Sequence, residues 1–314
     1  MQAPSWTPDI LGNGFEACYR PHPDDYSGAV RSTIVRLRAS APGPMAILYV
    51  HGYSDYFFQT ELAQMFAEHG YNFYAVDLRK YGRSYMEGQK MFQVRDLHEY
   101  FADIDDAIDV MAADGITKII LMGHSTGGLT TALYLSEDHS PLIRGLILNS
   151  PFLDWNLPPL VKKIVVPIAS ALGRYLPNVR VHQKPDTGYA HSLLARYEGE
   201  WDYRTEWKPD ILPDPDLGWI RAIRRAQQQL RRGHIHEPVL LMHSTESVRR
   251  GDEASKYHRA DAILEVESIS RHGRVLSHRV TEVPLAGGLH DLALSRPEVR
   301  QAMYTAILTW LREI

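Results

Sequence analysis

The sequence contains one cysteine, Cys18, among its 314 residues. A single cysteine excludes an intramolecular disulfide and a cysteine-rich metal site, and it is consistent with a reducing compartment. No apolar run is long enough to span a bilayer, and the first 20 residues lack the basic start and apolar core of a secretory signal. We therefore expect a cytoplasmic protein without a membrane span.

The sequence also lacks a block of basic residues. Its formal net charge is −4 and its sequence pI is about 6.4, so we expect no nucleic-acid partner. Hydrophobic residues make up 44% of the chain and charged residues 23%, which is typical of a globular protein. This length allows one large α/β domain with an insertion, or two domains.

Short apolar runs alternate with helical patterns along most of the chain. The runs predict strands buried on both faces at residues 46–50, 72–76, 118–122, 143–148, 238–242 and 280–284. The helical patterns cover residues 61–69, 97–113 and 297–311. Two further runs, 15–22 and 29–39, predict an antiparallel edge. The alternation predicts a mostly parallel sheet with right-handed crossovers.

This alternation stops after residue 151. Residues 152–235 hold eight of the 19 prolines and four of the six tryptophans, and they show no regular exchange of strand and helix. We interpret this stretch as an insertion over the edge of the sheet. The predicted organisation is a core formed by residues 1–151 and 236–314, with a cap, or lid, at 152–235.

An apolar stripe runs along residues 157–172 inside this predicted cap. Its members recur at helical spacing: Leu160, Val161, Ile164, Val165 and Ile168. Three roles fit such a stripe: transient contact with a membrane or lipid surface, the lining of an acyl tunnel, or the packing face of the cap.

The segment 118–135 carries the strongest chemical signal. An apolar strand leads into the turn Gly123-His124-Ser125-Thr126-Gly127, and a helical pattern follows. A serine at a sharp strand-to-helix bend needs residues with almost no side chain two positions before and after it. Gly123 and Gly127 meet this requirement, and the alternative is an ordinary Ser-Gly turn. The context favours Ser125 as a nucleophile.

A serine hydroxyl needs a histidine to take its proton and an acid to orient that histidine. His290 follows the last predicted strand in a glycine-containing loop, so it is the candidate base. Two acids follow the strand at 238–242. Glu246 lies in the first loop, whereas Asp261 begins what reads as the next helical stretch, after an excursion over 248–260. We favour Asp261 and keep Glu246 as the alternative.

The negative charge that develops on the substrate needs two N–H donors. The backbone of Thr126 is one candidate, and that of Tyr53, in the loop after the strand 46–50, is the other. His124, beside the nucleophile, completes the predicted oxyanion and substrate-binding group. His51 is expected to be a structural hydrogen-bonding residue.

These motifs, in this order, resemble the α/β-hydrolase superfamily. The matching segments are His51-Gly52, Val76 to Ser84, Gly123 to Gly128 and Gly288 to Asp291. Within the superfamily, the chain is similar to the serine hydrolase branch of monoacylglycerol lipases and lysophospholipases, which is serine aminopeptidase S33-like. The resemblance implies an eight-stranded α/β-hydrolase sheet flanked by helices, a Ser125–Asp261–His290 triad and a cap that selects the substrate. It also implies structural roles for Asp77 and Arg79.

The chain departs from this branch at two places. Ser244-Thr245-Glu246 replaces the usual glycine-serine-x-aspartate, and residues 53–58 lack the usual Gly-Glu-His continuation. We therefore expect a serine hydrolase of carboxylic esters without confining it to glycerides. Its partner is a small acyl ester, and we expect neither a cofactor nor a metal, because the pair His234 and His236 has no evident third ligand.

Other functions remain open. An aminopeptidase, a thioesterase and an acyltransferase would use the same triad, and a noncatalytic binding protein would keep only the fold.

Overall fold

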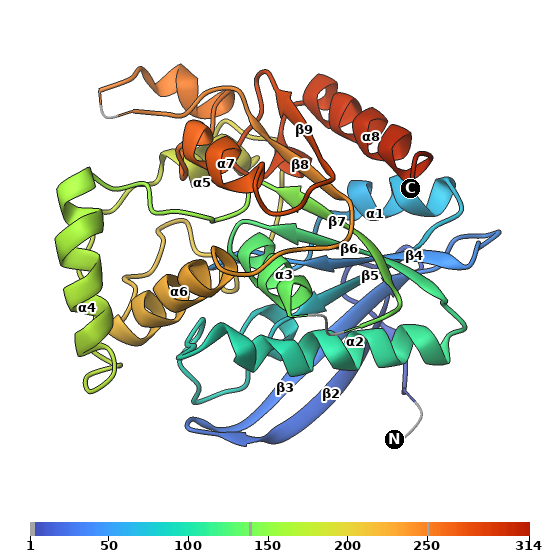
Figure 1. Cartoon of the computed structure of the whole chain (residues 1–314). Helices are drawn as coiled ribbons and strands as arrows, with labels where there is room; N and C mark the ends of the chain where they lie inside the picture. The colour runs from blue at the N-terminus through green and yellow to red at the C-terminus, as the bar shows by residue number, and fades with distance from the viewer. Residues whose placement is uncertain (1–3, 138–139, 250) are drawn as a thin grey trace.

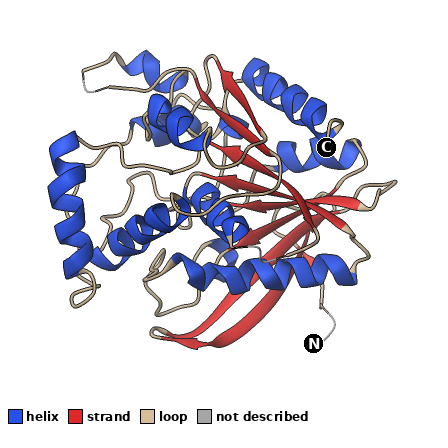
Figure 2. Cartoon of the chain, in the orientation of Figure 1, coloured by secondary structure: helices blue, strands red, loops and turns tan. Residues whose placement is uncertain are grey.

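The computed structural model describes residues 4–137, 140–249 and 251–314, and its centre is one twisted sheet (Figures 1 and 2). The strand order is β1-β2-β3-β5-β4-β6-β7-β8-β9. Pairing is antiparallel from β1 to β5 and parallel from β5 to β9. The strands are β1 (Thr7–Pro8), β2 (Glu16–Asp25), β3 (Gly28–Leu37), β4 (Met45–Val50), β5 (Asn72–Asp77), β6 (Lys118–His124), β7 (Ile143–Asn149), β8 (Val239–Ser244) and β9 (Val280–Leu285).

Helices cover both faces of the sheet. The α-helices that the structure describes are α1 (Thr60–Glu68), α2 (Phe101–Ala113), α3 (Thr126–Ser136), α4 (Val166–Leu172), α5 (Gly188–Leu193), α6 (Leu217–Leu230), α7 (Val266–Gly273) and α8 (Pro297–Leu311). Short 3₁₀ turns lie at Gly82–Ser84, Leu97–Tyr100, Ala254–His258 and Leu292–Leu294, and a π-helical turn, η3, lies at Val161–Val165.

Two hydrophobic cores form because successive residues of a strand face opposite sides. In β4, Ile47 and Tyr49 pack with α1 and α8, whereas Leu48 and Val50 pack with α2, α3 and α6. All four side chains are fully buried. A central strand must therefore be apolar along its whole length, which explains the continuous apolar runs in the sequence.

The observed elements match the predicted α/β-hydrolase sheet closely. Strands β2 to β9 are the eight that the resemblance implies, and the two-residue β1 adds a ninth at the antiparallel edge. The helix predicted at 97–113 differs in its first turn, because these residues begin with a 3₁₀ turn before α2. Asp96 and Glu99 form a capping box there, which fixes the first turn.

The segment 152–235 contains η3, α4, α5 and α6, and within it the structure describes no strand of the main sheet. α6 packs on α3 and contributes Ile220, Ile223 and Leu230 to the larger core. α4 packs on α6 and lies at the margin of the molecule (Figure 1). The domain limits at residues 151 and 235 stay predictions. Among the described residues, no helix combines the length and apolarity needed to cross a membrane.

Candidate active site

Ser125 lies at the bend between β6 and α3 in a backbone conformation that is rare for a residue with a side chain. Its φ is 53° and its ψ is −117°. Such strain persists only where the surroundings enforce it. A Cβ on Gly127 would lie 2.3 Å from the carbonyl oxygens of Val50 and His51, and one on Gly123 would lie 2.6 Å from the carbonyl oxygen of Gly127. Glycine is therefore required on both sides of the bend.

The structure brings Ser125, His290 and Asp261 together in one chain of hydrogen bonds. The Nε2 atom of His290 lies 3.0 Å from Oγ of Ser125, and its Nδ1 atom lies 2.9 Å from Oδ2 of Asp261. All three residues are buried. The serine follows β6, the histidine follows β9, and the aspartate lies beyond β8, so the three meet at the carboxyl ends of parallel strands.

The local structure around Asp261 differs from the prediction. A helix was expected to begin at Asp261, but α7 begins at Val266. The reason is that Oδ1 of Asp261 accepts the N–H groups of Ile263 and Leu264, each at 2.8 Å, which holds the chain in a turn.

Glu246, the alternative acid, lies elsewhere. It is exposed, and its Oε2 atom lies 3.7 Å from Nζ of Lys256. Of the two candidate acids, Asp261 is the one that hydrogen-bonds to His290.

Asp291 is next to the histidine in sequence but faces away from its ring. Its Oδ1 accepts the amide of Asn149 at 2.7 Å, and its Oδ2 accepts the amide of Gln59 at 2.9 Å. Burial alone would raise the pKa of Asp291, but nearby His124 and these two amides outweigh it and lower that pKa. Asp291 is thus an ionised anchor beneath the site.

His124 is buried beside Ser125, and its ring centroid lies 4.8 Å from that of His290. Its Nδ1 atom lies 3.2 Å from the carbonyl oxygen of Asn149. Burial lowers the pKa of His124, so the neutral ring is favoured.

The loop after β4 lies directly against Ser125. A Cβ on Gly52 would come within 3.1 Å of Cβ of Ser125. Tyr53 and Thr126 both line the same cavity as Ser125, and Thr126 is the first residue of α3, so its N–H has no partner within that helix. His51 has the expected structural role, since its Nε2 accepts the N–H of Leu78 at 3.0 Å.

Asp77 and Arg79 also form structural contacts. Asp77 accepts the backbone N–H of Phe57 at 2.9 Å, and Arg79 forms a buried ion pair with Asp103 at 2.6 Å. These contacts fix the loops that follow β4 and β5.

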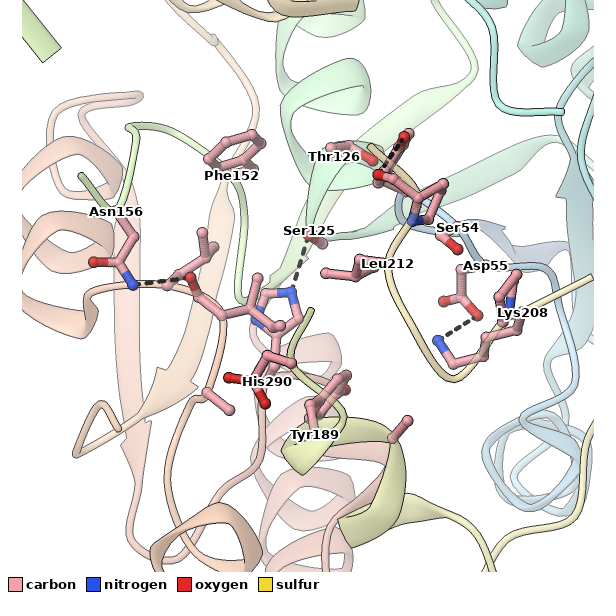
Figure 3. Close-up of a pocket in the computed structure, with 18 of the residues that line it drawn as sticks. Ser54, Asp55, Ser125, Thr126, Phe152, Asn156, Tyr189, Lys208, Leu212 and His290 are labelled. Atoms are coloured by element: carbon pink, nitrogen blue, oxygen red, sulfur yellow. Dashed lines mark hydrogen bonds and ion pairs between the residues drawn. The ribbon is translucent and has the colours of Figure 1, made fainter. Parts of the chain in front are cut away.

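A cavity of about 320 Å³ opens over Ser125 and His290. Its wall combines the core loops with the segment 152–235, and most of it is apolar or aromatic. The apolar and aromatic lining residues include Tyr53, Phe152, Trp155, Leu157, Tyr189, Leu193, Trp219, Ile263 and Leu264. This volume suits a small organic ligand. In Figure 3, Ser125 and His290 lie between Asn156 on one side and Asp55 with Lys208 on the other.

Three residues at this site escaped the sequence analysis. Asp55 and Lys208 form an ion pair at 2.9 Å, and the hydroxyl of Tyr189 accepts the N–H of Asp291 at 3.0 Å. Asp55 could have been noticed as an acid in the loop after β4. Lys208 and Tyr189 have no sequence signal, because they lie in the irregular segment and reach the site through long-range packing.

Comparisons with known proteins agree with this fold. A family model described as serine aminopeptidase, S33, matches residues 44–260. Phospholipase YtpA of Bacillus subtilis (strain 168) is 28% identical over 160 residues, which are 50% of this chain and 58% of that protein. The aligned part of the chain thus spans little more than half of this curated relative.

Two solved structures illustrate the likeness in fold. A soluble variant of monoglyceride lipase from Saccharomyces cerevisiae has a TM-score of 0.65 at 16% identity, covering 94% of this chain and 96% of that one. The monoacylglycerol lipase of Paleococcus ferrophilus has a TM-score of 0.59 at 21% identity, covering 88% and 98%. The family match covers more than half of the chain and includes the turn at Ser125; the protein therefore belongs to the serine aminopeptidase S33 family of α/β-hydrolases.

Proposed function

We propose that this protein hydrolyses small carboxylic esters through an acyl-enzyme on Ser125. The observation that carries this proposal is the hydrogen-bonded series Ser125–His290–Asp261 at the floor of a largely apolar cavity. The curated relative is named a phospholipase, and the two solved lipases are named for acylglycerols. These names support an acyl substrate for this chain.

The first half of the reaction forms the acyl-enzyme. Nε2 of His290 takes the proton of Ser125 as Oγ attacks the ester carbon. Asp261 accepts the Nδ1–H of His290, which fixes the tautomer and stabilises the imidazolium. The N–H groups of Tyr53 and Thr126 hold the oxyanion, and collapse of the tetrahedral intermediate expels the alcohol with the proton from His290.

The second half returns the enzyme to its starting state. A water molecule gives a proton to His290 and attacks the acyl carbon, and the acid leaves as Ser125 recovers its proton. His124 supports both halves as a neutral wall of the site, because a second imidazolium beside His290 would oppose the positive charge that forms there.

The test uses p-nitrophenyl esters and a fluorophosphonate probe. Ser125→Ala should lose about 10⁴-fold or more of kcat while keeping its melting temperature and circular dichroism. The control is Ser255→Ala, because Ser255 is exposed and does not line the cavity, unlike Tyr257 of the same Ala254–His258 turn. Retained turnover in Ser125→Ala, or a folded wild-type chain that the probe does not label, contradicts the proposal. The second result would favour a noncatalytic binding protein.

An aminopeptidase is the second candidate, because the family model is described by that activity. The same three residues would then attack an amide. A direct comparison of kcat/KM for amino-acid p-nitroanilides with that for p-nitrophenyl esters separates the two. The apolar and aromatic wall favours the ester.

We also propose that residues 152–235 act as a cap that touches lipid surfaces. η3 and α4 present an outward apolar face, with Leu160 exposed to 69% and Ile168 to 55%. Nearby Leu157 lines the cavity, so this face continues to the cavity mouth. A helix with exposed large aliphatic side chains gains free energy by entering the lipid interface.

A further inference from the structure

Some buried polar atoms in the wall of the cavity have no hydrogen-bond partner. Among the described residues, buried side-chain atoms without a hydrogen-bond partner include four on residues that line it: Oγ of Ser54, Oδ2 of Asp55, Nε1 of Trp155 and Oδ1 of Asp210. Buried polar atoms in native proteins are nearly always paired. A ligand bound in the cavity is one group that can complete the hydrogen bonds of these four atoms.

Asp55 has the most demanding of these atoms. It is 1% exposed, and its Oδ1 accepts the ammonium of Lys208 at 2.9 Å, while its Oδ2 has no partner among the described residues. A buried carboxylate oxygen can only accept hydrogen bonds, so it requires a donor. Oδ1 of Asp210 has the same need, because its own ion pair with Arg196 uses Oδ2.

The charged residues that line the cavity further restrict the class of ligand that can bind there. The described carboxylates that line the cavity are Asp55, Asp186 and Asp210, whereas Lys208 supplies the single ammonium. That ammonium already pairs with Asp55. A phosphate placed here would meet carboxylates rather than an unpaired cation, which is unfavourable at low dielectric.

The charged pair Asp55 and Lys208 lies apart from the aromatic part of the cavity wall. Figure 3 shows Ser54, Asp55 and Lys208 on one side of Ser125, and Phe152 and Asn156 on the other. An ester bound across Ser125 has two arms, so the acyl arm suits the Phe152 side and the alcohol arm suits the Asp55 side.

We propose that Asp55, held by Lys208, forms a subsite for an alcohol group that donates hydrogen bonds and carries no negative charge. Hydroxyl and protonated amine groups share this chemistry. The inference rests on the proposed ester hydrolysis, and it sets this chain apart from an enzyme that requires a phosphate head group. Asp55 is then the residue that determines specificity for the alcohol.

The test is a panel of hexanoyl esters below their aggregation concentration, all compared by kcat/KM. The alcohols are propanol, 2,3-dihydroxypropanol, 2-(dimethylamino)ethanol, choline and glycerol phosphate. The dihydroxypropyl and dimethylaminoethyl esters should exceed the propyl and choline esters by about tenfold or more, because a site built to bind a donor rejects its analogue. The glycerol phosphate ester should be the slowest. The choline ester is the control for positive charge, because its quaternary ammonium group is charged but has no N–H to donate.

Asp55→Asn replaces the acceptor by a donor and frees Lys208 from its counter-charge. The preference for dihydroxypropyl over propyl should fall close to one, and turnover of the glycerol phosphate ester should rise relative to propyl. Asp202→Asn makes the same change at an exposed position of the segment 152–235, outside the cavity, and should keep the wild-type order.

The wild-type panel decides the proposal even if Asp55→Asn fails to fold. Equal rates for the propyl and dihydroxypropyl esters overturn it, as does a choline ester that equals the dimethylaminoethyl ester. Neither result touches the proposed hydrolysis. The proposed hydrolysis has its own tests, which are the turnover of Ser125→Ala and the labelling of the wild-type chain by the fluorophosphonate probe.

Discussion

Ser247 and Asp261 pair in an isolated parallel bridge that closes an excursion of the chain beyond β8. The backbone adds two hydrogen bonds, from Val248 to Asp261 at 2.7 Å and from Asp261 to Glu246 at 2.8 Å. The excursion therefore leaves Asp261 almost where a residue directly after β8 would lie. This closure allows Asp261 to reach His290 although a long segment separates Asp261 from the end of β8.

The first prediction concerns the acid. Asp261→Asn should lower kcat by about 10³- to 10⁴-fold, because the amide no longer favours the tautomer of His290 that can accept the serine proton. Glu246→Gln should stay within about twofold of wild type, since Glu246 is exposed and near Lys256. Steady-state kinetics on one ester measure both variants. A larger loss in Glu246→Gln reverses the assignment.

The second prediction concerns the turn from Gly123 to Gly127. Gly127→Ala should destabilise the fold by about 3 kcal/mol, because the new Cβ meets the fixed backbone oxygens of Val50 and His51. Gly43→Ala is the control, since its Cβ would lie 3.7 Å from the nearest atom. Urea unfolding of the three proteins gives the comparison. Equal stability of Gly127→Ala and wild type would show that the bend tolerates a side chain.

The core and two of the site residues could be predicted because their signals are local. Apolar runs mark strands that are buried on both faces, and the strained turn at Ser125 requires nearby glycines. His290 follows the last strand directly. The position of Asp261 at the start of an apolar stretch favours it over Glu246 but leaves Glu246 as an alternative, because no local pattern encodes how far an excursion runs before it returns.

The pairing of Asp55 with Lys208 could not be predicted from the sequence, for a related reason. Lys208 and Asp55 lie 153 residues apart in sequence, and each belongs to a loop without a regular pattern. Their pairing arises from how the segment 152–235 packs over the sheet. The exposure of the apolar face of α4 could not be predicted either, because an apolar stripe has the same spacing whether it faces a core or solvent.

The third prediction concerns pH and stability. Burial lowers the pKa of His124 below its ordinary value of 6.5, with Asp291, His290, Asp55 and Lys208 as the charged groups nearby. The unfolded chain therefore binds a proton more readily, so this residue's contribution to stability is present above pH 6.5 and is lost as the pH falls below it. His124→Asn should flatten the decline in melting temperature between about pH 6.5 and 5.

His98 is the matched control because its shift has the opposite sign. Burial would lower its pKa, but Asp96 and Glu137 outweigh that effect and raise it. His98 therefore stabilises the fold below pH 6.5, and this contribution is lost as the pH rises through its folded pKa. His98→Asn should steepen the decline on acidification. Parallel curves for wild type and His124→Asn would contradict the account of His124.

The fourth prediction concerns the exposed face of η3 and α4. Ile164 and Ile168 are exposed to 49% and 55%, so changing both to serine removes little packing and should leave the melting temperature within about 2 °C of wild type. The double variant should sediment less with phosphatidylcholine vesicles and should lose activity on an emulsified ester while keeping its activity on a dissolved one. Loss of interfacial binding explains this split, because the cavity and the triad are unchanged.

Val275→Ser, at a valine exposed to 73% on another part of the molecule, controls for the general loss of surface hydrophobicity. If Val275→Ser and the double variant lose vesicle binding equally, the face of α4 has no special role, and the apolar residues at the cavity mouth must be explained by substrate entry alone.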